Sequence, residues 1–245
     1  MTSEAARLDD DAAVGAAGPP QTTSARRALA LIGALAPARV FPAGADLLRQ
    51  GECPTGAYFI TAGLVKLHRG SADGRSVAIG LRAAGWPVGA AAVVLGQPHA
   101  ATATTVLDTT ALHVNALTLR GLLRSRPEVS EYLLGAASQE VQDATVLLAD
   151  IACAPARERL ERLLADLAAA AGRPDGDGQF RFQLPLRHWE LAQLVNVTPQ
   201  YLCELLAELE HEQVLRRHKG WLVLDPDEPC PRVETRHVSA GGRSA

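Results

Sequence analysis

The sequence lacks any hydrophobic run long enough to cross a bilayer. A transmembrane helix needs roughly 20 consecutive apolar residues, and no run in this 245-residue chain approaches that length. The first 25 residues carry Glu4, Asp9, Asp10 and Asp11 where a secretory signal would have a basic stretch followed by an apolar one. We therefore expect a cytoplasmic protein that makes no membrane contact.

The cysteines lack the clustered spacing of a metal site. They are spread along the chain with no C-x-x-C pair, whereas zinc and iron-sulfur sites gather their thiolates. We expect buried or unreactive thiols and no cofactor. The cysteines are Cys53, Cys153, Cys203 and Cys230.

The sequence also offers little for an enzyme. A metal-binding barrel would need clustered imidazole and carboxylate ligands. His68, His99 and His113 are the only histidines of the β-rich region, and they form no H-x-H pair and have no carboxylate at ligand spacing. We expect no metal and no catalytic residue. Stoichiometric metal in the purified protein would revive the enzymatic alternative.

A basic excess is missing as well. The formal net charge is −3, which gives no global electrostatic reason to expect nucleic acid as a partner. A local basic patch can still bind phosphates. Composition alone therefore does not decide the function.

The chain divides by composition into five parts. Residues 1–25 and 225–245 are rich in small residues and proline without sustained periodicity, which predicts disordered tails. Residues 26–126 open with a short helical segment and continue as a β-rich domain, residues 127–153 form one long helix, and residues 154–224 form a smaller domain of helices and short strands.

Short β-type runs punctuated by glycine predict a sandwich or barrel in the β-rich domain. The runs AYFIT, LVKLH and SVAIGL are separated by turn residues, and Thr104 begins a further short run. Asp73-Gly74 between two runs is a strong hairpin signal, because both residue types tolerate the positive φ angles of a tight turn.

A hydrophobic stripe predicts that the long helix is a dimer interface. Pro127 suits the first turn, and the stripe recurs at spacings of three and four. Small residues in the stripe would let a second chain approach closely. The alternative is a helix that packs only on its own domain. The stripe comprises Val129, Leu133, Ala136, Glu140, Ala144, Leu147 and Ile151.

The stretch HWELAQLVNVTPQYLCELLAEL predicts two short helices that cross at a steep angle. Asn196 adopts the left-handed conformation readily, Thr198 can cap the second helix, and Pro199 fits its first turn. We interpret residues 198–210 as a recognition helix for the major groove of DNA. A plain helical hairpin is the alternative.

A basic hairpin follows the second helix. Val214 to Arg217 and Trp221 to Leu224 alternate like a two-stranded wing, whose basic tip suits phosphates, although such a tip is often only a solvated turn. The expected DNA-binding residues are Arg187, Thr198, Gln200, Tyr201, Glu204, Arg216, Arg217 and Lys219.

The order of these parts resembles the Crp-Fnr family over about three quarters of the chain. The resemblance rests on FPAGADLLRQGE, AYFITAGLVKL, the DGR hairpin and ELAQLVNVTPQYLCELLAELE. It implies an α+β fold with a jelly-roll sensor domain, a dimerisation helix at roughly residues 128–151 and a winged helix-turn-helix domain. It also implies double-stranded DNA, a second copy of the chain and RNA polymerase as partners, with an effector in the β-roll that repositions the DNA-binding domains.

The sequence departs from the cyclic-nucleotide binders of that family. Those members place Gly-Glu in a short helix and then Arg-Ser-Ala or Arg-Thr-Ala, whereas here Ala90 follows Gly89 and the arginine position falls on His99 or Ala100. Without the guanidinium, the cyclic phosphate forgoes a charge-assisted contact. We expect neither cAMP nor cGMP to bind. The degenerate pocket is filled by side chains or takes a more apolar small molecule. Its expected residues are Trp86, Gly89, Ala90, His99, Ala100 and Ala101.

A second departure affects DNA binding. The recognition helix carries Glu204 and Glu208 but no arginine, so it repels phosphates. Gln200 can read adenine and Glu204 can accept from cytosine. The competing hypothesis is a family member that does not bind DNA and acts through protein contacts.

Overall fold

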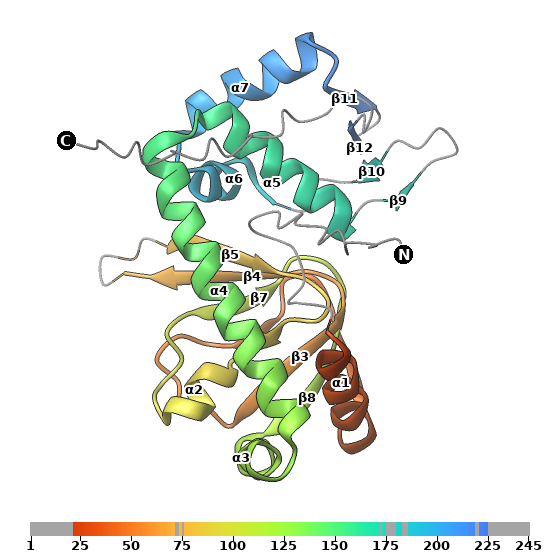
Figure 1. The fold of residues 1–245 in the computed structure, drawn as a ribbon. Coiled ribbons are helices and arrows are strands. Elements are labelled where there is room, and N and C mark those ends of the chain that lie inside the picture. Colours follow the sequence, from red (N-terminus) through yellow and green to blue (C-terminus); the bar gives the residue numbers. More distant parts are fainter. Residues whose placement is uncertain are drawn as a thin grey trace, which may run out of the picture.

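The computed structural model comprises a β-rich domain, a long helix and a smaller helical domain, arranged along one axis (Figure 1). The expected carboxyl-terminal tail, residues 1–21 of the expected amino-terminal tail and the wing tip at Lys219 lie outside the residues that the structure describes. The end of the expected amino-terminal tail is instead ordered, because Thr22 caps a helix that begins at Thr23 and buries Ala25. The described residues are 22–71, 74, 76–171, 173–174, 180–182, 186–218 and 221–224.

The β-rich domain contains two four-stranded antiparallel sheets, with strand orders β1-β8-β3-β6 and β2-β7-β4-β5. Neighbouring strands are mostly non-consecutive in the chain, as in a jelly roll. The strands are β1 (Ala38–Phe41), β2 (Asp46–Leu48), β3 (Gly56–Ala62), β4 (Val65–Gly70), β5 (Ser76–Arg82), β6 (Pro87–Val88), β7 (Thr102–Thr105) and β8 (Thr109–Asn115).

Alternating burial along the strands builds the core between the sheets. Ile60 of β3, Val65 of β4 and Ala103 of β7 are all fully buried in one cluster. Side chains on successive strand residues point to opposite faces, and Phe59, beside Ile60, is therefore buried in a second cluster that contains Ile32. Gly63 joins β3 to β4 at φ +96°, and a Cβ there would lie 2.6 Å from the Asp108 carbonyl oxygen. Only glycine fits this turn.

The long helix α4 (Pro127–Cys153) begins at the expected proline. Proline suits the first turn because its missing N–H would have no partner there. Val129, Tyr132 and Ala136 in the amino-terminal half are buried, and this half contacts α1 and α3. The carboxyl-terminal half extends past the β-rich domain (Figure 1). The other helices of this region are α1 (Thr23–Leu35), α2 (Ala90–Leu95) and α3 (Ala116–Ser125).

The C-terminal domain combines three helices with a sheet of order β11-β12-β10-β9. Leu164, Leu191 and Leu202 are fully buried at its centre. None of the described helices in the whole chain is long and apolar enough to span a membrane. The elements are α5 (Ala156–Ala171), α6 (His188–Val195), α7 (Pro199–His211), β9 (Arg173–Pro174), β10 (Phe180–Phe182), β11 (Leu215–His218) and β12 (Trp221–Leu224).

The two domains share one hydrophobic cluster. Leu64 and Leu81 of the β-rich domain are 0% and 1% exposed and belong to the same cluster as Leu191 and Leu209 of the C-terminal domain. The C-terminal domain is therefore docked on the β-rich domain, and the covalent link through α4 is not its only attachment.

The structure confirms the expected α+β architecture and shifts some element bounds. β7 covers 102–105, whereas the sequence predicts a run that starts at Thr104. The strand starts earlier because Thr102 already pairs with His68, and it stops at Thr105 because its partner strand begins at Val65. Likewise, Thr198 caps α7 and the helix proper begins at Pro199.

Candidate nucleic-acid interface

The turn between α6 and α7 has the geometry that the sequence predicts. Asn196 is left-handed at φ 55°, and Pro199 occupies the first turn of α7. The Tyr201 backbone N–H donates to Thr198 Oγ1 at 3.2 Å. This cap satisfies an amide that the helix itself leaves unpaired. These residues set the angle between the two helices.

The two faces of α7 differ sharply. Its inner face packs into the domain, whereas the predicted contact residues Gln200, Tyr201 and Glu204 are all exposed, Tyr201 at 45%. These three side chains lie in the first two turns, so the capped end of the helix is free to approach a ligand. The buried residues are Leu202, Leu205, Leu206 and Leu209.

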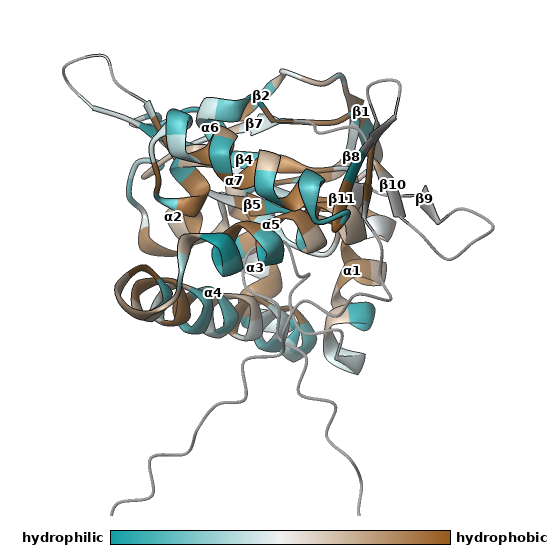
Figure 2. Ribbon diagram, turned by 90° about the horizontal axis from the view of Figure 1, so that it is seen from above, coloured by the Kyte–Doolittle hydropathy of each residue, from teal (hydrophilic) through white to brown (hydrophobic). Residues whose placement is uncertain are grey.

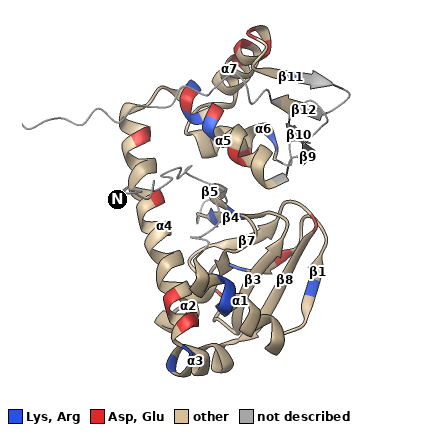
Figure 3. Ribbon diagram, turned by 45° about the vertical axis from the view of Figure 1, so that its right-hand side comes forward, with Lys and Arg blue, Asp and Glu red and all other residues tan. Residues whose placement is uncertain are grey.

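Cations flank α7 but do not lie on it. The helix sequence PQYLCELLAELEH contains no lysine or arginine, and Figure 3 shows only acidic positions along it. Arg187, which precedes α6, and Arg216 on β11 are both exposed, as a phosphate contact requires. The side chain of Arg217 and the whole of Lys219 lie outside the described residues.

The predicted dimerisation stripe turns partly toward its own protomer. Val129 and Ala136 are 0% and 2% exposed, and Glu140 pairs with Arg82 at 2.6 Å. A second chain therefore cannot contact Val129 or Ala136. A straight helix has 3.6 residues per turn, so a stripe read at a period of 3.5 drifts around it. The remaining members are half-buried or exposed: Leu133, Ala144, Leu147 and Ile151.

A different stripe of α4 is free. Leu134, Val141 and Leu148 are 70%, 68% and 71% exposed and recur every seven residues. Residues three positions after each of them are also exposed, which completes the a/d pattern of a coiled coil. Figure 2 shows α4 at the outside of the molecule, with hydrophobic stretches along it. We call this stripe the outer seam: Leu134, Ala137, Val141, Ala144, Leu148 and Ile151.

Val141 and Leu148 lie beside the stripe that was predicted from the sequence. Their spacing of seven, continued back to Leu134, is a signal that identifies the seam from the sequence. Which of two adjacent stripes faces outward still depends on how α4 packs against α1 and the β-rich domain.

His99 is one of the two residues, with Ala100, that the resemblance aligns with a phosphate-binding arginine. Its side chain is 7% exposed, and a Cβ on Gly89 (φ +81°) would lie 3.1 Å from His99 Cε1 and 2.7 Å from Leu48 Cδ2. Its carbonyl accepts from the Gly51 N–H at 2.8 Å. Burial lowers the pKa of His99, which Glu52 opposes. The site therefore holds a neutral, closely packed imidazole at the start of α2.

Trp86 belongs to the core between the sheets. It is 3% exposed, clusters with Val88 and with Ala136 of α4, and lies under the Arg82 guanidinium at 4.8 Å. The predicted pocket residues thus do not share one surface. Ala90 is buried, Ala101 is half-buried and Ala100 is exposed.

The three histidines of the β-rich domain lie apart. His68 lies between Thr104 and Ser76, while the His113 ring is 4.7 Å from that of Tyr58. Among the described residues, no group of three or more histidine, cysteine, aspartate or glutamate side chains is placed to hold a metal ion.

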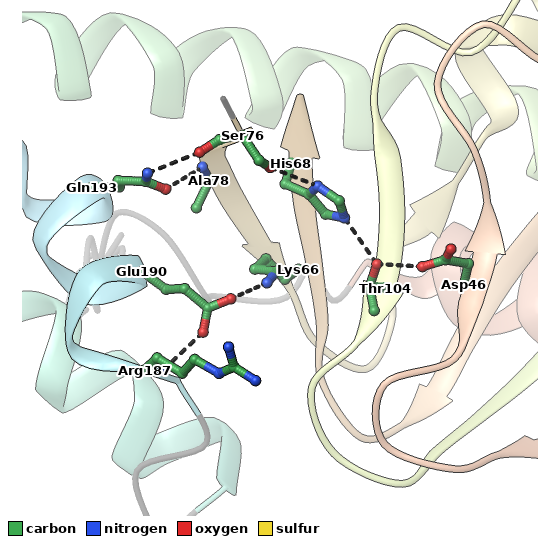
Figure 4. A network of polar contacts seen from close by, with 9 residues as sticks. All are labelled: Asp46, Lys66, His68, Ser76, Ala78, Thr104, Arg187, Glu190 and Gln193. Carbon is green, nitrogen blue, oxygen red and sulfur yellow. Dashed lines mark hydrogen bonds and ion pairs between the residues drawn. The ribbon is translucent and has the colours of Figure 1, made fainter. Parts of the chain in front are cut away.

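Polar side chains fasten α6 to the sheet β2-β7-β4-β5 (Figure 4). Glu190 pairs with Lys66 of β4, and both side chains are largely buried, at 8% and 15% exposed. Gln193 Nε2 donates to the Ser76 carbonyl at 2.9 Å, and its Oε1 accepts from the Ala78 N–H at 2.8 Å. These contacts could not be predicted from the sequence, because no local pattern links α6 to β4 or β5.

A pocket of about 190 Å³ lies between β5, α4, α5 and α6. Its arginines are already engaged within the chain: Arg82 pairs with Glu140, and Arg162 pairs with Asp150. The pocket therefore presents balanced charge and does not resemble an anion-binding site.

Both domains match known family models. Residues 38–126 match the cyclic nucleotide-binding domain, and residues 158–228 match the Crp-like helix-turn-helix domain. The matches cover the β-rich domain and the domain that contains α6, α7 and the wing strands.

Similar proteins are transcription regulators. The CRP-like cAMP-activated global transcriptional regulator of Mycobacterium tuberculosis is 28% identical over 185 residues, which is 76% of this chain and 79% of that protein. The cyclic AMP receptor protein of Thermus thermophilus is 26% identical over 182 residues, which is 74% of this chain and 81% of that protein.

Solved structures share the fold. FixK2 from Bradyrhizobium japonicum superposes with a TM-score of 0.65 at 17% identity, over 77% of this chain and 92% of that one. A CRP/FNR-family transcriptional regulator from Thermus thermophilus superposes with a TM-score of 0.64 at 22% identity, over 77% of this chain and 93% of that one. With both family domains matched in the order that the fold shows, the chain belongs to the Crp-Fnr family of DNA-binding transcription regulators, which are not enzymes.

Proposed function

We propose that the protein binds specific double-stranded DNA sites as a homodimer. The observation that carries this is the free amino-terminal end of α7, where Gln200, Tyr201 and Glu204 are exposed while the leucines on the opposite face of the helix are buried in the domain. The second helix of a helix-turn-helix contacts base edges with this end. Gln200 suits adenine and Glu204 suits the amino group of cytosine.

The outer seam supports pairing of two copies. An isolated protomer exposes Leu134, Val141 and Leu148 in one line, and a second α4 packed against them removes this apolar surface from water. Two-fold pairing presents two α7 helices, so we expect half-sites about one helical turn apart.

Charge sets the strength of DNA binding. Arg187 and Arg216 supply exposed cations, and the wing tip in the sequence adds more, whereas Glu204 and Glu208 repel phosphates. We therefore infer that affinity depends on a few phosphate contacts and that sequence preference comes from α7. RNA polymerase is the expected protein partner at a promoter.

We infer that neither cAMP nor cGMP is the effector, although the two curated relatives above are named for cAMP. By the resemblance, the position of the phosphate-binding arginine falls on His99, which is buried, or on Ala100, and the position of the ribose-binding glutamate falls on Ala90. Trp86 and its neighbours fill the core beside this region. A small, uncharged effector remains compatible with these residues.

Selection from a random duplex library tests the proposal. The full-length protein should enrich a two-fold symmetric motif, and titration of the best site should show a negative slope of log K against log salt. No enrichment at any salt concentration would reject sequence-specific binding by the chain alone.

Two matched variants separate base reading from charge. Glu204→Gln and Glu208→Gln remove the same charge, but Glu204 lies one turn nearer the capped end of α7. We expect both to raise affinity and only Glu204→Gln to change the preferred base, because only that side chain reaches a base edge. Identical motifs for both variants would contradict base reading by Glu204.

Protein contact is the second candidate function. The absence of lysine and arginine from α7 favours it, since acidic helix surfaces bind basic partners more readily than DNA. Retention of a transcriptional effect in cells by a protein that selects no DNA motif would favour this alternative.

A further inference from the structure

A chain of polar side chains crosses all four strands of the sheet β2-β7-β4-β5 (Figure 4). The Thr104 hydroxyl on β7 donates to Asp46 Oδ1 on β2 at 2.7 Å. His68 Nε2 on β4 lies 2.9 Å from Thr104 Oγ1, and its Nδ1 lies 3.1 Å from Ser76 Oγ on β5. We call Asp46, Thr104, His68 and Ser76 the cross-sheet ladder.

The hydrogen bonds of the cross-sheet ladder all run in one direction, from the Ser76 hydroxyl toward the Asp46 carboxylate. Thr104 has one hydroxyl hydrogen, which it gives to Asp46, so it can only accept from His68 Nε2. His68 Nδ1 is then the acceptor, and the Ser76 hydroxyl donates to it. The bond from Thr104 lowers the pKa of Asp46, which burial opposes, and so keeps the terminal acceptor ionised. Interrupting one bond weakens the neighbouring bonds, because hydrogen bonds in a chain polarise one another.

The cross-sheet ladder ends at the residue that holds the DNA-binding domain. The Ser76 carbonyl accepts from Gln193 Nε2, and the next outward amide, that of Ala78, donates to Gln193 Oε1. Because β5 is an edge strand, the Gln193 amide takes the place of a neighbouring strand. With the adjacent Lys66–Glu190 ion pair, it fixes α6 along β5 in one register.

The other end of the cross-sheet ladder adjoins the region around His99. β7 begins one residue after Ala101, and Thr102 Oγ1 accepts from the Gln50 N–H at 3.0 Å. Leu48 of β2 lies against Gly89. A displacement of the segment that contains His99 therefore acts on β2 and β7, the strands that carry Asp46 and Thr104.

We propose that the cross-sheet ladder and the Gln193 contact form a latch that transmits the position of β7 to the DNA-binding domain. While Thr104 holds His68, α6 stays docked along β5; when the ladder is interrupted, this docking loosens. Thr104 and His68 are positioning residues, since the hydrogen bonds described for them do not reach α6. The regulatory meaning of the latch rests on the proposed function, but its existence does not.

Thr104→Val tests the latch, with Thr102→Val as its matched control. Both variants remove a hydroxyl group from β7 and leave a side chain of the same shape. The Thr102 hydroxyl accepts from the Gln50 backbone N–H and lies outside the cross-sheet ladder. The readout is hydrogen exchange at the Ala78 amide, whose acceptor is Gln193. Gln193→Ala shows the rate without that acceptor.

We expect Thr104→Val to raise the exchange rate of the Ala78 amide roughly fivefold, as loss of one hydrogen bond would. Thr102→Val should leave that rate within about twofold of the wild-type rate. Unchanged exchange across β3 in the same sample shows that the fold is intact. Equal Ala78 rates in the two threonine variants would overturn the proposal.

A distance measurement gives a second readout. Cys53 on the β-rich domain and Cys203 on α7 are both exposed, so spin labels can be attached there after Cys153→Ser and Cys230→Ser, with excess unlabelled chain to suppress signals between subunits. Thr104→Val should broaden the distribution, and an unchanged distribution would count against the latch. Neither readout needs DNA, so a protein that binds no DNA would refute the proposed function alone.

Discussion

Glu190 has two roles in the docked DNA-binding domain. Its carboxylate accepts the Arg187 backbone N–H at 2.8 Å at the start of α6, and it pairs with Lys66 of β4. Burial opposes ionisation, but the hydrogen bonds from Lys66 and Arg187 outweigh it and lower the pKa of Glu190. One carboxylate thus stabilises a helix start and joins two domains.

His68 should make stability sensitive to mild acid. Burial lowers its pKa, as does Lys66, while Asp46 and Glu190 act in the opposite direction. The unfolded chain therefore takes up the proton first. The contribution of His68 to stability is complete above the unfolded pKa of 6.5 and falls as the pH drops through it toward the folded value.

The measurement is urea unfolding of wild type and His68→Gln at about pH 7.5 and about pH 5.5, where each proton changes the free energy of unfolding by at most about 1.4 kcal/mol per pH unit. The variant should lose less stability on acidification. Part of the loss should remain, because burial also lowers the pKa of His99 and His113. His211→Gln, at the exposed end of α7, is the control. An equal acid response in His68→Gln and wild type would contradict this role.

Installing the residues that the resemblance assigns to cyclic-nucleotide binding should create affinity for cAMP. We expect wild type to give no saturable heat in calorimetric titration and the triple variant Ala90→Glu, His99→Arg, Ala100→Ser to bind, because the guanidinium and hydroxyl supply charge-assisted bonds. Ala90→Glu alone is the control and should stay silent. Micromolar binding by wild type would show that the neutral His99 does not exclude the nucleotide.

The helix α4 illustrates how one element serves two partners. Its amino-terminal half buries Val129, Tyr132 and Ala136 inside the protomer, while Leu134 and Val141 stay exposed on another side. A helix with one face on its own core and another face apolar toward water indicates a further packing partner.

Val141→Glu should separate the dimer without unfolding the protomer. Val141 is 68% exposed, so the carboxylate is solvated in the monomer but would be desolvated in a paired seam. Sedimentation should show the dimer dissociation constant raised by at least about tenfold, which corresponds to about 1.4 kcal/mol. Gln142→Glu, with the same charge one residue outside the seam, should stay dimeric. Equal association of both variants would place the interface elsewhere.

The two domains of the molecule are held together by a common core. Leu64 and Leu81 from the β-rich domain pack in the cluster that also contains Leu191 and Leu209. The polar contacts of Lys66 and Gln193 surround this apolar contact. Orientation comes from the directional bonds, and most of the docking free energy comes from the buried area.

Leu64→Ala should therefore weaken both domains together. Deleting a fully buried leucine side chain costs about 3 kcal/mol, and Leu64 is 0% exposed at the junction. Urea unfolding followed by far-ultraviolet circular dichroism and by tryptophan fluorescence should give one coincident transition at lower urea. Val40→Ala, at 73% exposure, should change little. Two separate transitions in wild type would show that the domains unfold independently.

Short-range chemistry explains which features could be predicted from the sequence alone. Asn196, Thr198 and Pro199 identify the helix-turn-helix because their backbone preferences act over a few residues. Pro127 and the glycine-punctuated strands likewise reveal the start of α4 and the β-roll. The predicted α7 contact residues are exposed because the helical period alone separates them from the buried leucines.

Contacts between distant segments required the folded chain. Lys66 and Glu190 lie 124 positions apart, and Ala78 and Gln193 lie 115 apart. No periodicity links such pairs, because burial of one surface against another depends on how complete elements pack. For the same reason the amino-acid pattern of α4 defines two candidate stripes, and only its packing on α1 and the β-roll leaves Leu134, Val141 and Leu148 facing outward.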